Sequence, residues 1–117
     1  MSKPLPHHVN KSQAKSHPNG CGYIWDMITG EINPKTSVDY CLMDAPSEKH
    51  KHLKTFEFYC ITKGTGVVHV GKESFRVEPG SVVQIPPENV HYTEPDGQLE
   101  MYVVNTPPFT ESDYIPE

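Results

Sequence analysis

Residues 50–64 read HKHLKTFEFYCITKG, and this stretch carries two histidines, a glutamate and a glycine at short spacing. His50 and His52 are two positions apart, so in an extended strand they share one face, with α-carbons about 6.6 Å apart. Imidazoles and carboxylates are good ligands for a divalent transition metal. Glu57 follows closely enough to arrive from the next strand, whereas the fold has to bring in His91 from further along the chain. The four side chains are therefore candidate ligands of one metal ion.

Each of these residues also has a simpler interpretation. His50 and His52 lie in the lysine-rich segment EKHKHLK, where isolated histidines are usually solvated, and His91 follows a proline-rich loop. Glu57, however, lies in an apolar strand, and an unpaired carboxylate on an inward face would be costly. Together the four favour a metal site. His69 sits between two valines, and we interpret it as structural.

Composition limits the classes of function. The chain has 117 residues, which fits a single domain, and its 12 prolines and 8 glycines favour short strands over long helices. The net charge of −5 and the absence of a Lys/Arg cluster argue against a nucleic-acid partner. No apolar run approaches the roughly 18–20 residues of a membrane span, and the N-terminus lacks a secretory pattern, so we expect a cytoplasmic protein. Three widely spaced cysteines do not form a disulfide framework.

The chain divides into a polar arm, residues 1–20, and a single domain, residues 21–117. Within the domain, short apolar runs separated by Gly/Pro turns predict an all-β sandwich or barrel. Any helix is expected to be one short turn around residues 111–114. The predicted strands are residues 23–29, 38–43, 56–62, 67–70, 74–77, 82–85, 91–93 and 99–104. Turns are expected at residues 63–66 and 95–97.

In residues 48–92 the sequence resembles the cupin superfamily. His50-x-His52-x4-Glu57-x6-Gly64 is similar to its first motif, and Pro79-Gly80 followed by Ile85-Pro86-Pro87 and His91 is similar to its second. The two motifs span residues 48–92. Two details depart from the family pattern: Ser81 stands where an acidic residue is common, and the asparagine that usually follows the last histidine has no clear match.

The resemblance implies a double-stranded β-helix, the jelly-roll barrel of cupins, with a metal ion in its mouth. It carries His50, His52, Glu57 and His91 over as the ligands. Bound metals in the family include iron, manganese, nickel, zinc and copper, and nitrogen and oxygen ligands suit any of them. Small members commonly form homodimers, which we expect here.

A four-ligand site leaves coordination positions open, as catalytic metals require. We therefore expect a small-molecule metalloenzyme of the oxygenase or isomerase type. The alternatives are a non-catalytic module that binds or senses a metal or small ligand and, less favoured, a metal-free isomerase-like cupin. Strand alternation places Tyr59, Gln84, Tyr40 and Met101 in the pocket as candidate substrate contacts; Ile61, Met43 and Val103 are further candidates.

Overall fold

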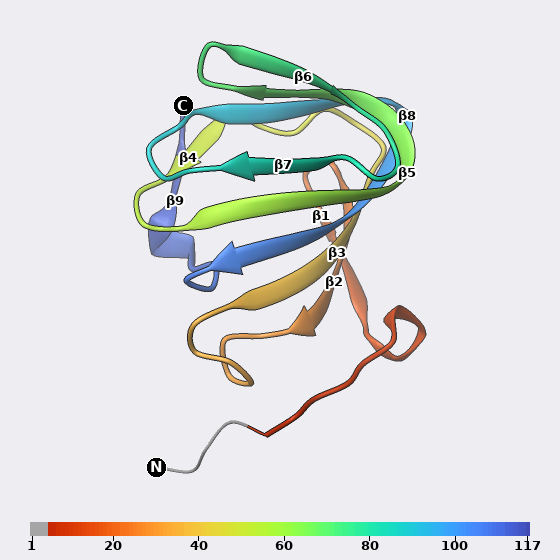
Figure 1. Ribbon diagram of the computed structural model, residues 1–117, viewed down its shortest axis with the longest axis vertical. Coiled ribbons are helices and arrows are strands. Elements are labelled where there is room, and N and C mark those ends of the chain that lie inside the picture. The colour runs from red at the N-terminus through yellow and green to blue at the C-terminus, as the bar shows by residue number, and fades with distance from the viewer. Residues whose placement is uncertain (1–4) are drawn as a thin grey trace.

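The computed structural model describes residues 5–117, and within them the chain forms one antiparallel sheet that curls around a common interior (Figure 1). Its two short 3-10 helices are η1 (Lys11–Gln13) and η2 (Glu111–Asp113). The strands are β1 (Ser16–Asn19), β2 (Gly22–Ile28), β3 (Ser37–Met43), β4 (His50–His52), β5 (Phe56–Val70), β6 (Glu73–Val77), β7 (Val82–Ile85), β8 (His91–Thr106) and β9 (Tyr114–Pro116). The prediction of an all-β jelly-roll barrel is confirmed. No helix in the described part of the chain is long and apolar enough to cross a membrane.

Strands β5 and β8 organise the barrel, because they pair with each other from Phe56↔Thr106 to Val70↔His91. β5 also pairs with β6 and β7, and β8 also pairs with β3 and β4. The sheet continues from β3 through β2 to β1 on one side, and from β4 to β9 on the other. Figure 1 shows β5 and β8 curving together around the interior.

The turns predicted at residues 63–66 and 95–97 are absent, because β5 and β8 each continue without interruption through these glycine-containing stretches. Gly64 has φ 81°, and a Cβ there would lie 2.1 Å from the Gln98 carbonyl oxygen, so the position accepts only glycine. The register shifts on both sides of Gly64, as at a β-bulge. The glycines therefore bend one long strand and do not end it.

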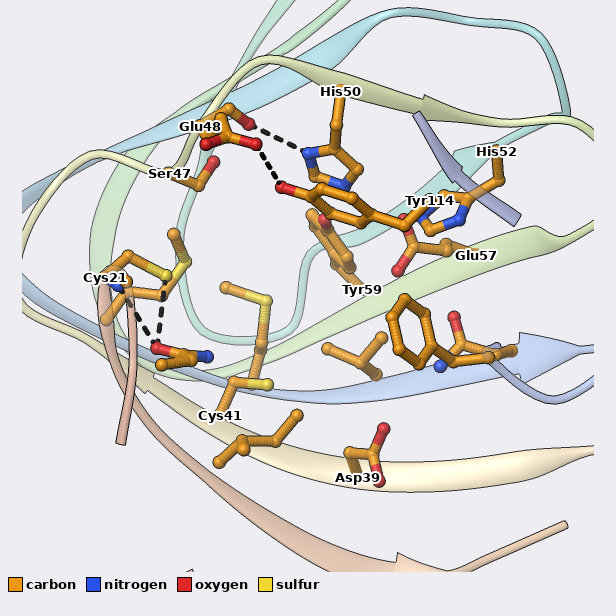
Figure 2. A pocket seen from close by; sticks show the side chains of 18 of the residues that line it. Cys21, Asp39, Cys41, Ser47, Glu48, His50, His52, Glu57, Tyr59 and Tyr114 are labelled. Atoms are coloured by element: carbon orange, nitrogen blue, oxygen red, sulfur yellow. Dashed lines mark hydrogen bonds and ion pairs between the residues drawn. The ribbon is translucent and has the colours of Figure 1, made fainter. Parts of the chain in front are cut away.

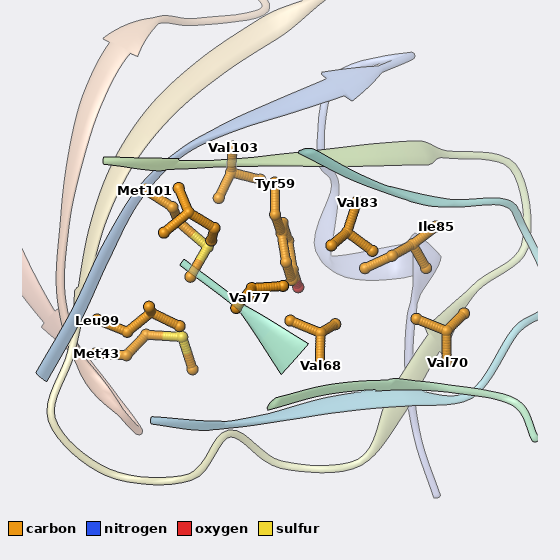
Figure 3. Close-up of a cluster of buried hydrophobic side chains, with 11 residues drawn as sticks. Met43, Tyr59, Val68, Val70, Val77, Val83, Ile85, Leu99, Met101 and Val103 are labelled. Carbon is orange, nitrogen blue, oxygen red and sulfur yellow. The ribbon is translucent and has the colours of Figure 1, made fainter. Parts of the chain in front are cut away.

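The register shift changes which residues of β5 face inward. Tyr59 and Ile61 are buried before it, and Val68 and Val70 are buried after it, so the inward face passes from odd to even positions. These four belong to a cluster of buried apolar side chains contributed by both layers of the barrel (Figure 3). Its other members are Met43, Val77, Val83, Ile85, Leu99, Met101 and Val103.

Both ends of the chain contribute more to the sheet than the sequence suggested. Ser16–Asn19, within the predicted arm, pair with β2 as an edge strand, although all four residues stay exposed. The predicted helical turn near the C-terminus is present as η2. After it, Tyr114–Pro116 form the unpredicted strand β9, which pairs with the histidine strand β4.

Candidate metal centre

The four predicted ligands lie together inside the barrel. His50 and His52 come from β4, Glu57 from the start of β5, and His91 from the start of β8. His50 lies directly opposite His91 in the sheet, whereas Glu57 pairs with Ile85 and Asn105 and reaches the histidines because the sheet curls. One nitrogen or oxygen atom from each residue lies within 4.8 Å of the others, and all four residues are buried. We call these residues the quartet.

Backbone carbonyls orient all three imidazoles in the same way. Nδ1 of His50 lies 2.8 Å from the Glu48 carbonyl oxygen, Nδ1 of His91 lies 2.9 Å from that of Asn89, and Nδ1 of His52 lies 3.1 Å from that of Asp113. Because a carbonyl only accepts, each Nδ1 carries the donated proton. Each Nε2 is then left with a free lone pair, which is the arrangement that metal-ligating histidines adopt.

Glu57 faces two of these lone pairs. Its Oε1 lies 2.8 Å from Nε2 of His91 and 3.2 Å from Nε2 of His52. Burial raises the pKa of Glu57, but protons shared by His52 and His91 outweigh burial and lower the pKa to about 2, so the group is a carboxylate when a cation lies between it and these imidazoles. Nε2 of His52 is buried and has no hydrogen-bond partner among the described residues. A carboxylate oxygen this close to two imidazole nitrogens requires a shared cation, either a proton or a metal ion, and the donor set fits a divalent metal.

Burial and charge act differently on two of the histidines. Burial lowers the pKa of His50, which favours the neutral form that binds metals. Burial also acts to lower the pKa of His52, but the adjacent Glu57 carboxylate reverses the direction and raises it. The quartet therefore holds a proton in place of a metal most readily on the His52 side.

The C-terminal segment braces the quartet, which the sequence did not predict. The buried Asp113 carboxylate accepts backbone N–H groups from the loop after His52, with distances of 2.9 Å to Leu53 and 3.1 Å to Thr55. Tyr114 stacks on the His50 ring at a centroid distance of 4.4 Å, and its hydroxyl donates to Glu48 at 2.9 Å (Figure 2). A polar tail of this composition gives no periodic signal, so only the fold reveals these contacts.

The quartet opens into a cavity of about 840 Å³, a size typical of sites for small molecules. Three of the quartet residues line it directly, and the fourth, His91, contacts them without lining it. Apolar side chains form much of the wall, including the predicted contacts Tyr59 and Met101. Met43 and Val103 also line it, whereas Ile61 lies in the apolar cluster outside the wall.

Two predicted pocket residues lie elsewhere, because their strands present the opposite face. Gln84 is exposed, since its neighbours Val83 and Ile85 point inward. Tyr40 is buried on the outer side of β3, where its hydroxyl donates to Glu100 at 2.8 Å. The cavity is instead lined by the neighbours of Tyr40, Asp39 and Cys41. Predicting Gln84 and Tyr40 as pocket residues was wrong.

The sequence also missed Asn105, which continues the inward series of Met101 and Val103 along β8 and lines the cavity. Simple alternation from Met101 would have identified it. His69, in contrast, lies outside the quartet, where its ring contacts Glu94 at 2.6 Å and Ser74 at 2.8 Å. The three cysteines are free.

Comparison with known proteins agrees with this architecture. A protein of Methanocaldococcus jannaschii, the uncharacterized protein MJ1618, is 32% identical over 66 residues, which cover 55% of this chain and 53% of the relative. The match thus spans about half the length of that relative.

Solved structures match over nearly the whole chain. A protein from Planctomyces limnophilus superimposes with a TM-score of 0.85 at 18% identity, covering 95% of this chain and 96% of that one. Streptomyces Pac13, described as a nucleoside dehydratase, superimposes with a TM-score of 0.81 at 16% identity, covering 97% and 92%. At these identities the likeness concerns the fold alone.

The model of one protein family, described as the AraC-like ligand binding domain, matches residues 38–113. That range begins in β3, ends at η2 and includes the whole quartet. Because the match covers more than half of the chain and the fold agrees, this chain belongs to the family of AraC-like ligand binding domains, which have a cupin-type fold.

Proposed function

We propose that this chain binds one divalent transition-metal ion through His50, His52, Glu57 and His91 and acts on a small molecule in the adjoining cavity. The observation that carries the proposal is the shared orientation of the imidazoles, with Nδ1 donating to backbone carbonyls and Nε2 facing the centre. The 2.8 Å contact between Glu57 Oε1 and His91 Nε2, which requires a shared cation, supports it further. The reaction would be of the oxygenase or isomerase type.

When bound, a divalent ion at this site supplies Lewis acidity toward a substrate oxygen and, for iron, manganese or copper, redox chemistry. The chain's own contribution is positioning and hydrogen bonding. Tyr59 lines the cavity two positions from Glu57 on the same strand, and burial raises its pKa well above the ordinary value, so its hydroxyl stays protonated and is a hydrogen-bond donor. Apolar wall residues such as Met101 and Val103 exclude water from the substrate.

Metal analysis followed by assay tests the proposal. Protein purified without chelators is expected to contain about one equivalent of metal, which quartet variants lose. The Fe(II)- and Mn(II)-loaded forms are then screened against small polar metabolites for oxygen consumption and, by NMR, for isomerised products. The proposal fails if no metal is taken up, or if the fully loaded protein turns over none of a broad substrate panel.

A second candidate function is binding without reaction, as in a sensor or accessory module. The description of the matched family as ligand binding domains favours this candidate. A ligand that raises the melting temperature and is recovered unchanged after long incubation with the metal-loaded protein would support binding without reaction.

We also propose that the chain forms a homodimer through the outer face of the barrel. Val82 and Tyr102 flank Cys60 in one cross-strand row, and their side chains are 65% and 38% exposed. Such an apolar row is stabilised when a second copy covers it. Light scattering during size-exclusion chromatography should give a dimer at micromolar concentration, and Val82→Lys should give a monomer. A monomeric wild type would refute the dimer.

A further inference from the structure

A second polar group lines the cavity two strands away from Glu57. Asp39 on β3 lies directly opposite Asp26 on β2, and both carboxylates line the cavity wall. Asp26 is about half exposed at the rim, where His17 Nδ1 lies 3.7 Å away in a surface contact that contributes little. The Asp39 side chain makes no hydrogen bond or ion pair with any described residue. A carboxylate in this position is available to a ligand.

Asn105 provides independent evidence that this part of the cavity wall binds a hydrogen-bonding ligand. It lies in the sheet between Ser37 on β3 and Glu57 on β5, and it is only 2% exposed. Its Oδ1 is buried with no hydrogen-bond partner among residues 5–117, although the residue lines the cavity. An unmade hydrogen bond on a buried amide costs about 1–3 kcal/mol, so a donor supplied from the cavity would stabilise Asn105.

The charge of the cavity narrows what can bind there. Four carboxylates line it, those of Asp26, Asp39, Glu48 and Glu57, and among the described lining residues there is no lysine or arginine. A bound divalent ion would offset two of these four negative charges, so the cavity would stay acidic, with His17 beside Asp26 as the nearest basic group outside the quartet among the lining residues. A ligand with a second anionic group would be repelled, whereas a cationic group would be attracted.

We propose that Asp26, Asp39 and Asn105 form an acidic subsite that binds the protonated amine end of a small molecule whose other end reaches the quartet. The subsite is defined by these three residues. That the subsite and the quartet together bind one substrate rests on the proposed function, whereas the preference of the subsite for amines does not. The substrate class is therefore an amine that also carries an oxygen ligand for a metal, such as an amino acid-like or amino alcohol compound.

The spacing of the strands sets the length of that molecule. Neighbouring strands lie about 4.8 Å apart, and inward positions along a strand about 6.6 Å apart, so Asp39 and Glu57 have α-carbons roughly 10–12 Å apart. Both side chains extend into the cavity and shorten this gap. A chain of about four to six atoms between the amine and the metal-binding oxygen would span it.

Matched probes test the subsite in the Zn(II)-loaded protein at pH 8. Calorimetric titration compares 5-aminopentanoate with pentanoate, which lacks the amine, and with glutarate, which has a second carboxylate in place of the aminomethyl end. We expect 5-aminopentanoate to bind about tenfold more tightly than pentanoate, and glutarate no more tightly than pentanoate. A preference for glutarate, equal binding of all three probes, or no binding of any probe would overturn the proposal.

Variants assign the preference to the subsite. Asp39→Asn keeps the side-chain shape and is expected to remove most of the amine preference while leaving pentanoate binding unchanged. Asn105→Leu is expected to weaken 5-aminopentanoate and to raise the melting temperature, since an unpaired buried amide is lost. Glu78→Gln removes an exposed carboxylate outside the cavity and should change neither probe. An amine preference unchanged in Asp39→Asn would refute the assignment.

A metal-free pair of probes separates this inference from the proposed function. Pentylamine and pentan-1-ol differ in the cationic group and need no metal. If the protein takes up no zinc but still prefers pentylamine, and loses that preference in Asp39→Asn, the proposed function fails and the acidic subsite stands. If zinc binds but neither amine probe is preferred, the acidic subsite fails and the metal site stands.

Discussion

At the quartet each imidazole is fixed by a backbone carbonyl, whereas at the acidic subsite Asn105 Oδ1 and the Asp39 carboxylate have no partner within residues 5–117. The quartet is thus organised before any ion binds, and what it needs is a cation shared among atoms already in position. The subsite is also in position, since it lies on paired strands, but its hydrogen bonds are left unmade. The difference indicates that the quartet suits a permanently bound ion, whereas the acidic subsite suits a ligand that binds and dissociates.

Removing one ligand of the quartet should have the largest effect. His52→Ala is expected to weaken Zn(II) binding more than about a hundredfold, because the loss of an outer-shell partner alone costs 10–100-fold. Competition against a chromogenic chelator measures the affinity. The matched control is His69→Ala, a histidine on the outside of the barrel, which should bind zinc as the wild type does. Equal zinc affinity in His52→Ala and wild type would show that the quartet is not the metal site.

Weakening the contacts of Asp113 with the loop after His52 should have the next largest effect. In Asp113→Asn, the side-chain NH₂ would face a backbone N–H of residues 53–55, so one hydrogen bond is replaced by a clash of donors. We expect a loss of about 2 kcal/mol in unfolding free energy and about tenfold in zinc affinity.

Glu111→Gln is the control for this brace, because it alters an exposed carboxylate on the same short helix. Urea denaturation and chelator competition on both variants separate the two effects. A normal zinc affinity in a destabilised Asp113→Asn protein would mean that Asp113 supports only the fold and does not position His52.

How far the sequence predicts this molecule depends on whether a residue's role is set locally. The quartet was predictable because its spacing reflects strand geometry and a turn, and the structure brings all four residues together. The direction in which a strand faces was not predictable where nothing fixed its register, since a shift of one residue inverts every side chain. For β3 the wrong face was chosen in this way, so Tyr40 was placed inside the cavity and Asp39 was overlooked.

Glycines posed a related problem. A glycine-rich stretch between apolar runs is compatible with a hairpin turn or with a bulge in a long strand, and both accept a positive φ. Only the pairing of Gly64 with Leu99, across the barrel wall, distinguishes the two. Tertiary contacts of this kind also account for β9 and Asp113, whose sequence surroundings are polar and irregular.

The last expected effect concerns the subsite, and it appears only as a pH dependence of stability. Burial, followed by the charges of Asp26 and Glu57, raises the pKa of Asp39 from 3.8 to about 7. Between these two values the folded chain holds a proton that the unfolded chain releases, so unfolding free energy falls as pH rises from about 4 to about 7. Asparagine at this position has no proton to lose.

Asp39→Asn should therefore match the wild type in stability near pH 4 and exceed it at pH 8, by on the order of 2 kcal/mol once partial solvent exposure is allowed for. Melting temperatures of both proteins across this range measure the difference, with Glu78→Gln as a control that should follow the wild type. A stability difference that does not change with pH would mean that the Asp39 carboxylate is already satisfied in the folded chain. In that case the contrast between an organised quartet and an unsatisfied subsite would rest on Asn105 alone.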